Sequence, residues 1–152
     1  MAISPKGSPL VQAAKEHEEV FANLPAYVHE AILRAYINGA VTNTLREEEM
    51  QLYLEPWLGG EGQKAFWRQV AQMSDKYTEE IEWRYSEIRC PVSILRGEQD
   101  EWISLEHGRQ LASRIPSSTF QIAPNAMHLV QEDAPEATMA TVLNFWSNIE
   151  GQ

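Results

Sequence analysis

An acidic side chain and an imidazole each follow a short apolar run in the last third of the 152-residue chain. Asp100 comes shortly after the run at residues 91–96, and His128 comes shortly after the run at 119–123. A carboxylate that hydrogen-bonds an imidazole fixes the tautomer of the ring and stabilises its protonated form. The imidazole can then take a proton from a nucleophile or from a water. The sequence therefore offers Asp100 and His128 as a candidate catalytic acid and base.

Both runs have the length and composition of buried strands in a parallel sheet. Between them, residues 104–115 place apolar side chains at the spacing of one helical face. A strand, a helix and a strand in this order form a crossover unit, which predicts two adjacent parallel strands. Because loops that leave parallel strands emerge at the same carboxyl end of the sheet, we expect Asp100 and His128 to meet there.

A catalytic triad also needs a nucleophile. The 152 residues contain no Gly-x-Ser-x-Gly motif, nor the same turn with Asp or Cys at its centre. Asp100 and His128 thus match two members of a catalytic triad, and the third member, the nucleophile, is not among these residues.

Two blocks of this sequence closely resemble the carboxyl-terminal third of α/β-hydrolases of the epoxide hydrolase and haloalkane dehalogenase type. The blocks are Cys-Pro-Val at 90–92 with Gly-x-x-Asp at 97–100, and Asn-Ala-Met-His-Leu-Val-Gln-Glu-Asp-Ala-Pro-Glu at 125–136. The resemblance implies that Asp100 is the triad acid and His128 the triad base. Met127 stands where the family usually has Gly, and Ser104 stands where Pro often follows the acid loop.

The amino-terminal part of the chain has helical periodicity and no strand pattern. Helices are expected over residues 9–23, 25–39, 44–54 and 63–74, with a short one from about 78 and a last one after Pro135. The resemblance implies that residues 1–88 are the helical cap, or lid, of the family and that 89–152 are a segment of its core. The expected fold class is α/β: an incomplete α/β-hydrolase fold in which a helical cap precedes strand, helix, strand and helix.

Some local features of the cap can be predicted in more detail. The helix over 25–39 carries an apolar stripe that leaves His29 off this face and facing solvent; the stripe is Val28, Ala31, Ile32, Ala35 and Tyr36. Thr44 and Glu47 match a capping box that would start the next helix. The glycine-rich stretch at 59–62 lacks the residues of a phosphate loop and reads as a turn.

The resemblance implies hydrolysis of an ester, epoxide or carbon–halogen bond by a nucleophile–His–Asp triad. Without the nucleophile and the oxyanion hole, we expect the chain to be inactive alone and to act on a small-molecule substrate only when completed by an amino-terminal half. The strand at Val92 would expose an unpaired edge, which predicts homo-oligomerisation through this edge. The alternatives are a non-catalytic helical binding or dimerisation module that keeps the pair as relics, and a truncated fragment.

Several side chains near the pair admit simpler interpretations. Trp102 either lines the mouth of the site and binds substrate, or it covers the loop. Cys90 is expected to be a small buried filler. Glu132 and Asp133 are expected to favour the dipole of the last helix from its amino end.

Composition narrows the remaining function classes. A hydrophobic content of 43% is enough for a domain with a sizeable core. The net charge of −10 argues against nucleic acid and anionic membranes as partners. No apolar run is long enough to span a bilayer and no signal-type amino end is present, so the expected location is cytoplasmic. No cofactor or metal is expected, since His17 in its acidic cluster has no second histidine at ligand spacing.

Overall fold

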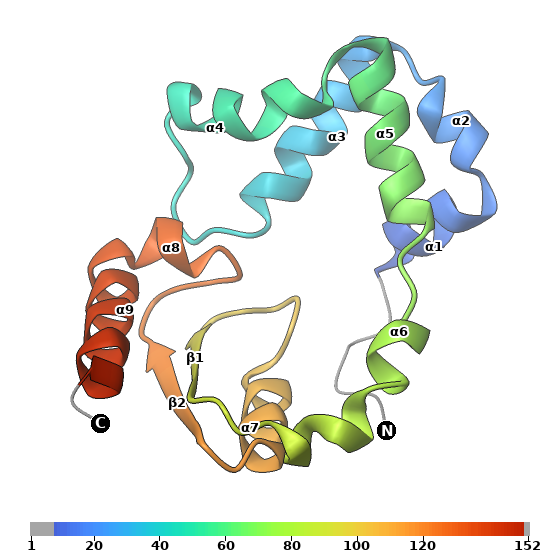
Figure 1. The fold of residues 1–152 in the computed structure, drawn as a ribbon. Helices are drawn as coiled ribbons and strands as arrows, with labels where there is room; N and C mark the ends of the chain where they lie inside the picture. The colour runs from blue at the N-terminus through green and yellow to red at the C-terminus, as the bar shows by residue number, and fades with distance from the viewer. Residues whose placement is uncertain (1–7, 151–152) are drawn as a thin grey trace. The chain divides into compact units, whose positions relative to one another are not determined.

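The structure is a computed structural model that describes residues 8–150. Within this range the chain forms two compact units. The helical unit comprises residues 8–39 and 44–75, and the α/β unit comprises Ala40–Asn43 and residues 76–150. Figure 1 labels the α-helices and strands of both units along the chain.

In the helical unit, the first two helices pack against the last one. Its elements are α1 (Pro9–Glu16), α2 (Glu18–Ala22), α3 (Ala26–Asn38), α4 (Glu47–Leu54), the 3-10 helix η1 (Glu55–Trp57) and α5 (Gly59–Ala71). Its hydrophobic core joins α1 to α5 through Val11, Ala14, Trp67 and Val70. These residues recur at helical spacing within each helix, so each helix buries one face.

The buried face of α3 differs from the predicted one. Ala31 and Ala35 are exposed, and the buried positions are His29, Leu33 and Ile37. The prediction that His29 faces solvent is therefore wrong, since its exposed fraction is 1%. His29 is buried because both ring nitrogens have partners: Trp67 Nε1 donates to Nδ1 at 3.1 Å, and Nε2 lies 2.9 Å from the Trp57 carbonyl oxygen.

Three helix boundaries in this unit also differ. The predicted helix over 9–23 is interrupted at His17, whose φ of −138° is not helical. The capping box does not form at Thr44; Arg46 is the N-cap, and its backbone N–H donates to the Glu49 carboxylate at 2.9 Å. Gly59 takes a positive φ of 74° and already begins α5, so the turn is shorter than predicted.

The α/β unit contains the predicted crossover. Its elements are α6 (Lys76–Glu79), the 3-10 helix η2 (Glu82–Glu87), β1 (Val92–Gly97), α7 (Leu105–Arg114), β2 (Ser118–Ala123), α8 (Val130–Asp133) and α9 (Pro135–Glu150). The two strands pair in parallel, with Val92 opposite Ser118 and Gly97 opposite Ala123. The prediction of adjacent parallel strands is therefore confirmed. In the part of the chain that the structure describes, the sheet has these two strands.

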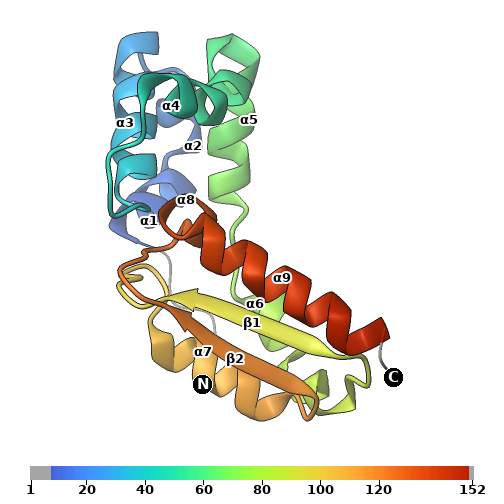
Figure 2. The same ribbon diagram turned by 90° about the vertical axis from the view of Figure 1, so that its left-hand side faces the viewer.

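The two long helices of this unit cover opposite faces of the sheet (Figure 2). On the α7 face, a Cβ at Gly108 would lie 2.7 Å from the Phe120 ring and 3.0 Å from Arg96 Cγ, so glycine permits the close packing of helix on strand. On the other face, Oγ1 of the α9 residue Thr141 lies 3.2 Å from Gln121 Oε1 of β2. Because side chains alternate along a strand, Arg96 belongs to the α7 face.

The ends of the two strands are packed tightly together. A side chain at Gly97 would overlap the carbonyl oxygens of Ala126 and Met127, so only glycine lets the loop after β2 lie against the end of β1. Backbone hydrogen bonds hold this arrangement: Glu98 N donates to Ala123 O at 2.9 Å, and Gln99 N donates to Ala126 O at 2.8 Å. The loops that carry the acid and the base therefore begin side by side.

Two further observations concern the surface. Cys90, which lies two residues before β1, is exposed, so the prediction of a buried filler is wrong. Among residues 8–150, no helix is both long enough and apolar enough to cross a membrane.

Candidate active site

The structure brings Asp100 and His128 together at the carboxyl end of the sheet. Nδ1 of His128 lies 3.1 Å from Oδ2 of Asp100, within hydrogen-bonding distance. The side chain of Asp100 is 1% exposed, whereas that of His128 is 27% exposed. Because an ionised carboxylate only accepts hydrogen bonds, Nδ1 carries the proton and donates, which leaves the lone pair on Nε2. This tautomer can accept a proton from a nucleophile or a water.

The carboxylate of Asp100 is fixed by its own loop. The backbone N–H groups of Trp102 and Ile103 both donate to Oδ1 at 2.9 Å. Such a turn, in which an aspartate side chain accepts from the backbone amides that follow it, forms between residues that are close in sequence. It turns Oδ2 toward the imidazole of His128.

Arg96 is a member of the site that the sequence analysis missed. Its guanidinium forms an ion pair with Oδ2 of Asp100, and Nη2 also donates to the Ile103 carbonyl oxygen at 2.6 Å. The side chain of Arg96 is 19% exposed, so the pair is largely shielded from solvent. A buried carboxylate needs such compensation. The signal in the sequence was a charged residue inside the predicted strand.

The ring of Trp102 lies against the imidazole of His128. The ring centroids are 4.8 Å apart and the planes are tilted by 37°. Trp102 therefore covers one face of the candidate base. Its role in binding a substrate stays a prediction.

The loop that leads to His128 makes its sharp turn at Asn125. Among the described non-glycine residues, Asn125 has the one positive φ, at 55°, so Met127 does not adopt the left-handed conformation. Asn is one of the residues that tolerate this conformation. The Met127 side chain at the usual glycine position is thus compatible with the loop.

Asp133 also differs from its predicted role. It ends the short helix α8, and its carboxylate accepts a hydrogen bond from Met127 N at 2.8 Å. The last helix begins two residues later, at Pro135. Asp133 therefore contacts the histidine loop in addition to preceding the last helix. The two bonded residues, Met127 and Asp133, are six positions apart, and no helical or strand periodicity predicts their contact.

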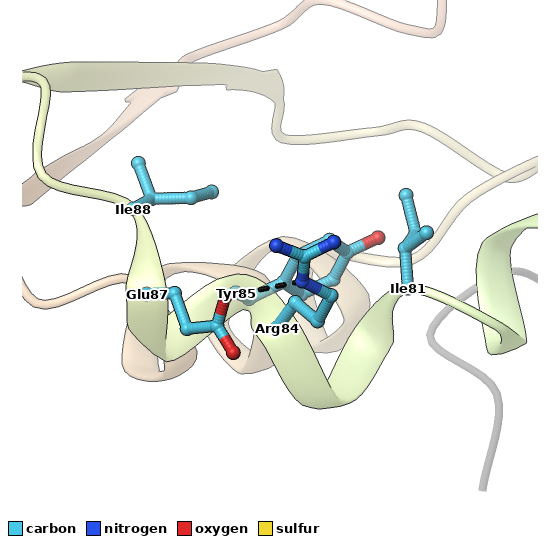
Figure 3. A pocket seen from close by; sticks show the side chains of 5 residues that line it. All are labelled: Ile81, Arg84, Tyr85, Glu87 and Ile88. Atoms are coloured by element: carbon cyan, nitrogen blue, oxygen red, sulfur yellow. Dashed lines mark hydrogen bonds and ion pairs between the residues drawn. The ribbon is translucent and has the colours of Figure 1, made fainter.

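The described residues also form hollows away from Asp100 and His128. One, of about 350 Å³, is formed along η2 by Ile81, Arg84, Tyr85, Glu87 and Ile88, and Arg84 Nε donates to Glu87 Oε2 at 3.1 Å across it (Figure 3). Another, of about 320 Å³, is a largely apolar groove between β1 and α9, lined by Ser93, Leu95, Val130, Thr138, Thr141, Val142, Phe145 and Trp146. Within residues 8–150, no three His, Cys, Asp or Glu side chains gather as metal ligands would.

Comparison with solved structures shows which known fold the chain shares. An α/β-hydrolase fold protein from Burkholderia ambifaria superposes with a TM-score of 0.88 at 49% sequence identity, over 95% of this chain and 53% of that one. The chain is therefore similar to α/β-hydrolases, and its described residues have the fold of about half of an α/β-hydrolase. No family model matches the sequence.

Other relatives agree with this assignment. Two further structures share the fold. The esterase of Thermogutta terrifontis has a TM-score of 0.69 at 18% identity, over 97% of this chain and 53% of that one. The ancestral haloalkane dehalogenase AncHLD2 has a TM-score of 0.68 at 20% identity, over 99% of this chain and 51% of that one. RutD of Caulobacter sp. strain K31, described as a carbamate hydrolase, is 45% identical over 60 residues, or 40% of this chain and 22% of that protein. The chain spans about half the length of these solved relatives. The helical-module alternative is not favoured by these comparisons.

Proposed function

We propose that this chain is the lid and acid–base part of an α/β-hydrolase, in which Asp100 orients His128 and His128 activates a nucleophile or a water. The observation that carries this proposal is the 3.1 Å contact between His128 Nδ1 and a carboxylate oxygen of Asp100 whose side chain is 1% exposed. In this proposal, the helical unit serves as the lid over a small-molecule substrate.

The chemistry follows from the tautomer. Nε2 of His128 takes the proton of a serine hydroxyl that attacks an ester, or of a water that hydrolyses the intermediate formed by an aspartate on an epoxide or a haloalkane. The imidazolium that forms is stabilised by the Asp100 carboxylate. The nucleophile would come from a segment outside these 152 residues, because no nucleophile turn occurs within them.

The surface beside β1 supports completion by such a segment. Among the described strands, β1 pairs only with β2, and the groove between β1 and α9 is largely apolar. On α9 the large apolar side chains Met139, Val142, Leu143 and Trp146 are all exposed. An unpaired strand edge beside apolar surface recruits another strand. We propose that this strand belongs to the nucleophile-bearing half, and a second copy of this chain is the competing occupant.

The substrate class remains a choice among the bonds that this machinery can break. An ester, an epoxide and a carbon–halogen bond differ in the nucleophile they need, and all can use the same acid and base. Trp102 is proposed to contact the substrate because it already covers the face of His128. A cytoplasmic location stays a prediction from the sequence.

Co-expression tests this function. The chain is produced with the half of the Burkholderia ambifaria protein that it does not cover, and the mixture is assayed against p-nitrophenyl acetate, an epoxide and a 1-haloalkane. We expect turnover of one of them by the complex and by neither part alone. His128→Ala should reduce turnover by about 10³-fold or more. His17→Ala, which removes an exposed histidine of the helical unit, is the matched control.

Two results would count against the proposal. One is turnover by the complex that His128→Ala and Asp100→Asn leave unchanged. The other is a complex that forms, retains the fold and hydrolyses none of the three substrates. Light scattering on the chain alone and with the added half of the Burkholderia ambifaria protein tells which occupant covers the β1 edge. A homodimer that this half converts into a one-to-one complex would support the proposal that the nucleophile-bearing half binds there.

A further inference from the structure

The residues on both sides of His128 are hydrogen-bonded to segments that are distant in sequence or belong to another element. Before His128, the Met127 N–H donates to Oδ2 of Asp133 at 2.8 Å. After His128, the Leu129 N–H donates to the carbonyl oxygen of Ala40 at 2.9 Å. The histidine is therefore held at two backbone points, one on each side.

The two points are joined to each other through Thr42. Its backbone N–H donates to both Asp133 oxygens, at 2.9 Å to Oδ1 and 3.0 Å to Oδ2. Its hydroxyl lies 3.2 Å from Oδ2 of Asp133 and 3.1 Å from the Asn125 carbonyl oxygen. Because a hydroxyl has a single proton, it donates to one of these acceptors at a time. One carboxylate thus joins the histidine loop to the segment Ala40–Asn43.

The segment that receives these bonds is itself anchored. Ala40 is 2% exposed and Val41 is 5% exposed, so the residues just before Thr42 are packed in the interior. Hydrogen bonds from N–H groups to an ionised carboxylate are about twice as strong as those between neutral groups. The anchored segment and the charged acceptor together make a rigid support for the loop.

We propose that Asp133 is a positioning residue for His128: by accepting from Met127 and Thr42, its carboxylate sets where the imidazole stands relative to Asp100. An asparagine would not replace it, since its NH₂ group would face one of the N–H donors that the carboxylate satisfies. A glutamate keeps two acceptor oxygens on a longer side chain. The catalytic consequence rests on the proposed function; the structural claim about the ring does not.

The structural claim is tested on the full chain by NMR of its four histidines. The Nδ1 proton of His128, assigned with His128→Ala, should give a downfield signal protected from exchange by Asp100. We expect Asp133→Asn to lose this signal to exchange with water while circular dichroism still reports a folded chain. Asp133→Glu should retain part of it. Glu136→Gln, which removes an exposed acid at the start of α9, is the control and should retain all of it.

Activity of the complemented protein gives the second readout. Misplacing a catalytic group by about 1 Å can cost about 10²-fold in rate, so Asp133→Asn should lower kcat by about 10–100-fold with KM changed less than twofold. Asp133→Glu should recover part of the lost kcat. Thr42→Val, which removes the hydroxyl and keeps the N–H donor, should give a smaller loss of the same kind and serves if Asp133→Asn does not fold.

The outcomes separate the two claims. A folded Asp133→Asn and a folded Thr42→Val that both keep the protected His128 proton would overturn the positioning role. If His128→Ala leaves turnover unchanged, the proposed function falls, yet loss of the protected proton in Asp133→Asn would still support the positioning of the ring. A loss of kcat in Asp133→Asn with the proton signal intact would also contradict the inference, because the effect would then not act through His128.

Discussion

The guanidinium of Arg96 and Nδ1 of His128 share one acceptor, the Oδ2 oxygen of Asp100. The other oxygen of this carboxylate accepts from two backbone amides, those of Trp102 and Ile103. The protein's own donors therefore hold both carboxylate oxygens of Asp100. Its orientation toward His128 follows from a strand residue and a loop turn acting together.

Removing the charge of Arg96 should destabilise the α/β unit. Arg96→Met leaves the Asp100 carboxylate, 1% exposed, without its cation, and breaking such a pair costs about 3 kcal/mol. Urea denaturation followed by circular dichroism measures the loss, and Arg96→Lys should recover part of it. Arg89→Met, at an exposed arginine that donates to the Ser86 carbonyl oxygen, is the control. Equal stability of Arg96→Met and the wild type would refute this account of the pair.

Adding one methyl group at Gly97 should displace the histidine loop. The new Cβ would overlap the carbonyl oxygens of Ala126 and Met127, and backbone cannot move aside as a flexible side chain can. We expect Gly97→Ala to cost about 1–3 kcal/mol, as overpacking does. Gly60→Ala, where the added Cβ meets no atom within 4 Å, should instead be neutral or stabilise α5. Thermal melting of both variants makes the comparison, and similar behaviour of the two would contradict it.

The buried histidine of the helical unit should be sensitive to replacement by an apolar residue. His29→Leu leaves the Trp67 indole N–H and the Trp57 carbonyl oxygen without their partner. Unsatisfied buried groups of this kind cost about 1–3 kcal/mol each, so we expect about 3 kcal/mol in total. The urea midpoint read from tryptophan fluorescence checks this value. His17→Ala should change it little, and a neutral His29→Leu would mean that water replaces the lost partner.

Acid should weaken the ion pair between α3 and α4. Arg34 donates to both oxygens of Glu47, at 2.8 and 2.9 Å, and this bonding lowers the pKa of Glu47 from 4.5 to about 2. A carboxyl whose pKa is lower in the folded chain stabilises the fold fully above its unfolded pKa and loses this contribution as the pH falls through its folded pKa. The urea midpoints of the wild type and Glu47→Gln should therefore differ above pH 4.5 and converge toward pH 2. Glu48→Gln, at an exposed neighbour, is the control.

Local patterns were sufficient to predict the α/β unit. The apolar runs around Ile94 and Ile122 and the helical face between them predicted parallel strands, and the paired strands confirm this. The meeting of Asp100 and His128 followed from the topology, because parallel strands end on the same edge. Each strand and the helix between them is marked by a pattern of residues adjacent in sequence, and the crossover rule then places the two strand ends together.

The errors have a different origin. The stripe predicted for α3 includes Ala31 and Ala35 because alanine is apolar. The structure instead buries His29, whose two ring nitrogens have hydrogen-bond partners in Trp57 and Trp67. That burial depends on partners 28 and 38 residues away. Asp133 was likewise interpreted through its own helix. A polar side chain is buried or exposed according to which donors and acceptors tertiary packing brings to it, and no local pattern contains this information.

The bond between Thr42 and Asp133 has a consequence for the construction of chimaeras. The stretch that joins α3 to α4 belongs to the α/β unit and hydrogen-bonds to Asp133, so the helices are not a contiguous cassette that can be cut at two points and exchanged. A recombinant that takes residues 8–75 wholesale from a homologue would import a foreign Ala40–Asn43 under the histidine loop. Swapping the flanks while retaining these four native positions would transfer the helices and preserve the base in place.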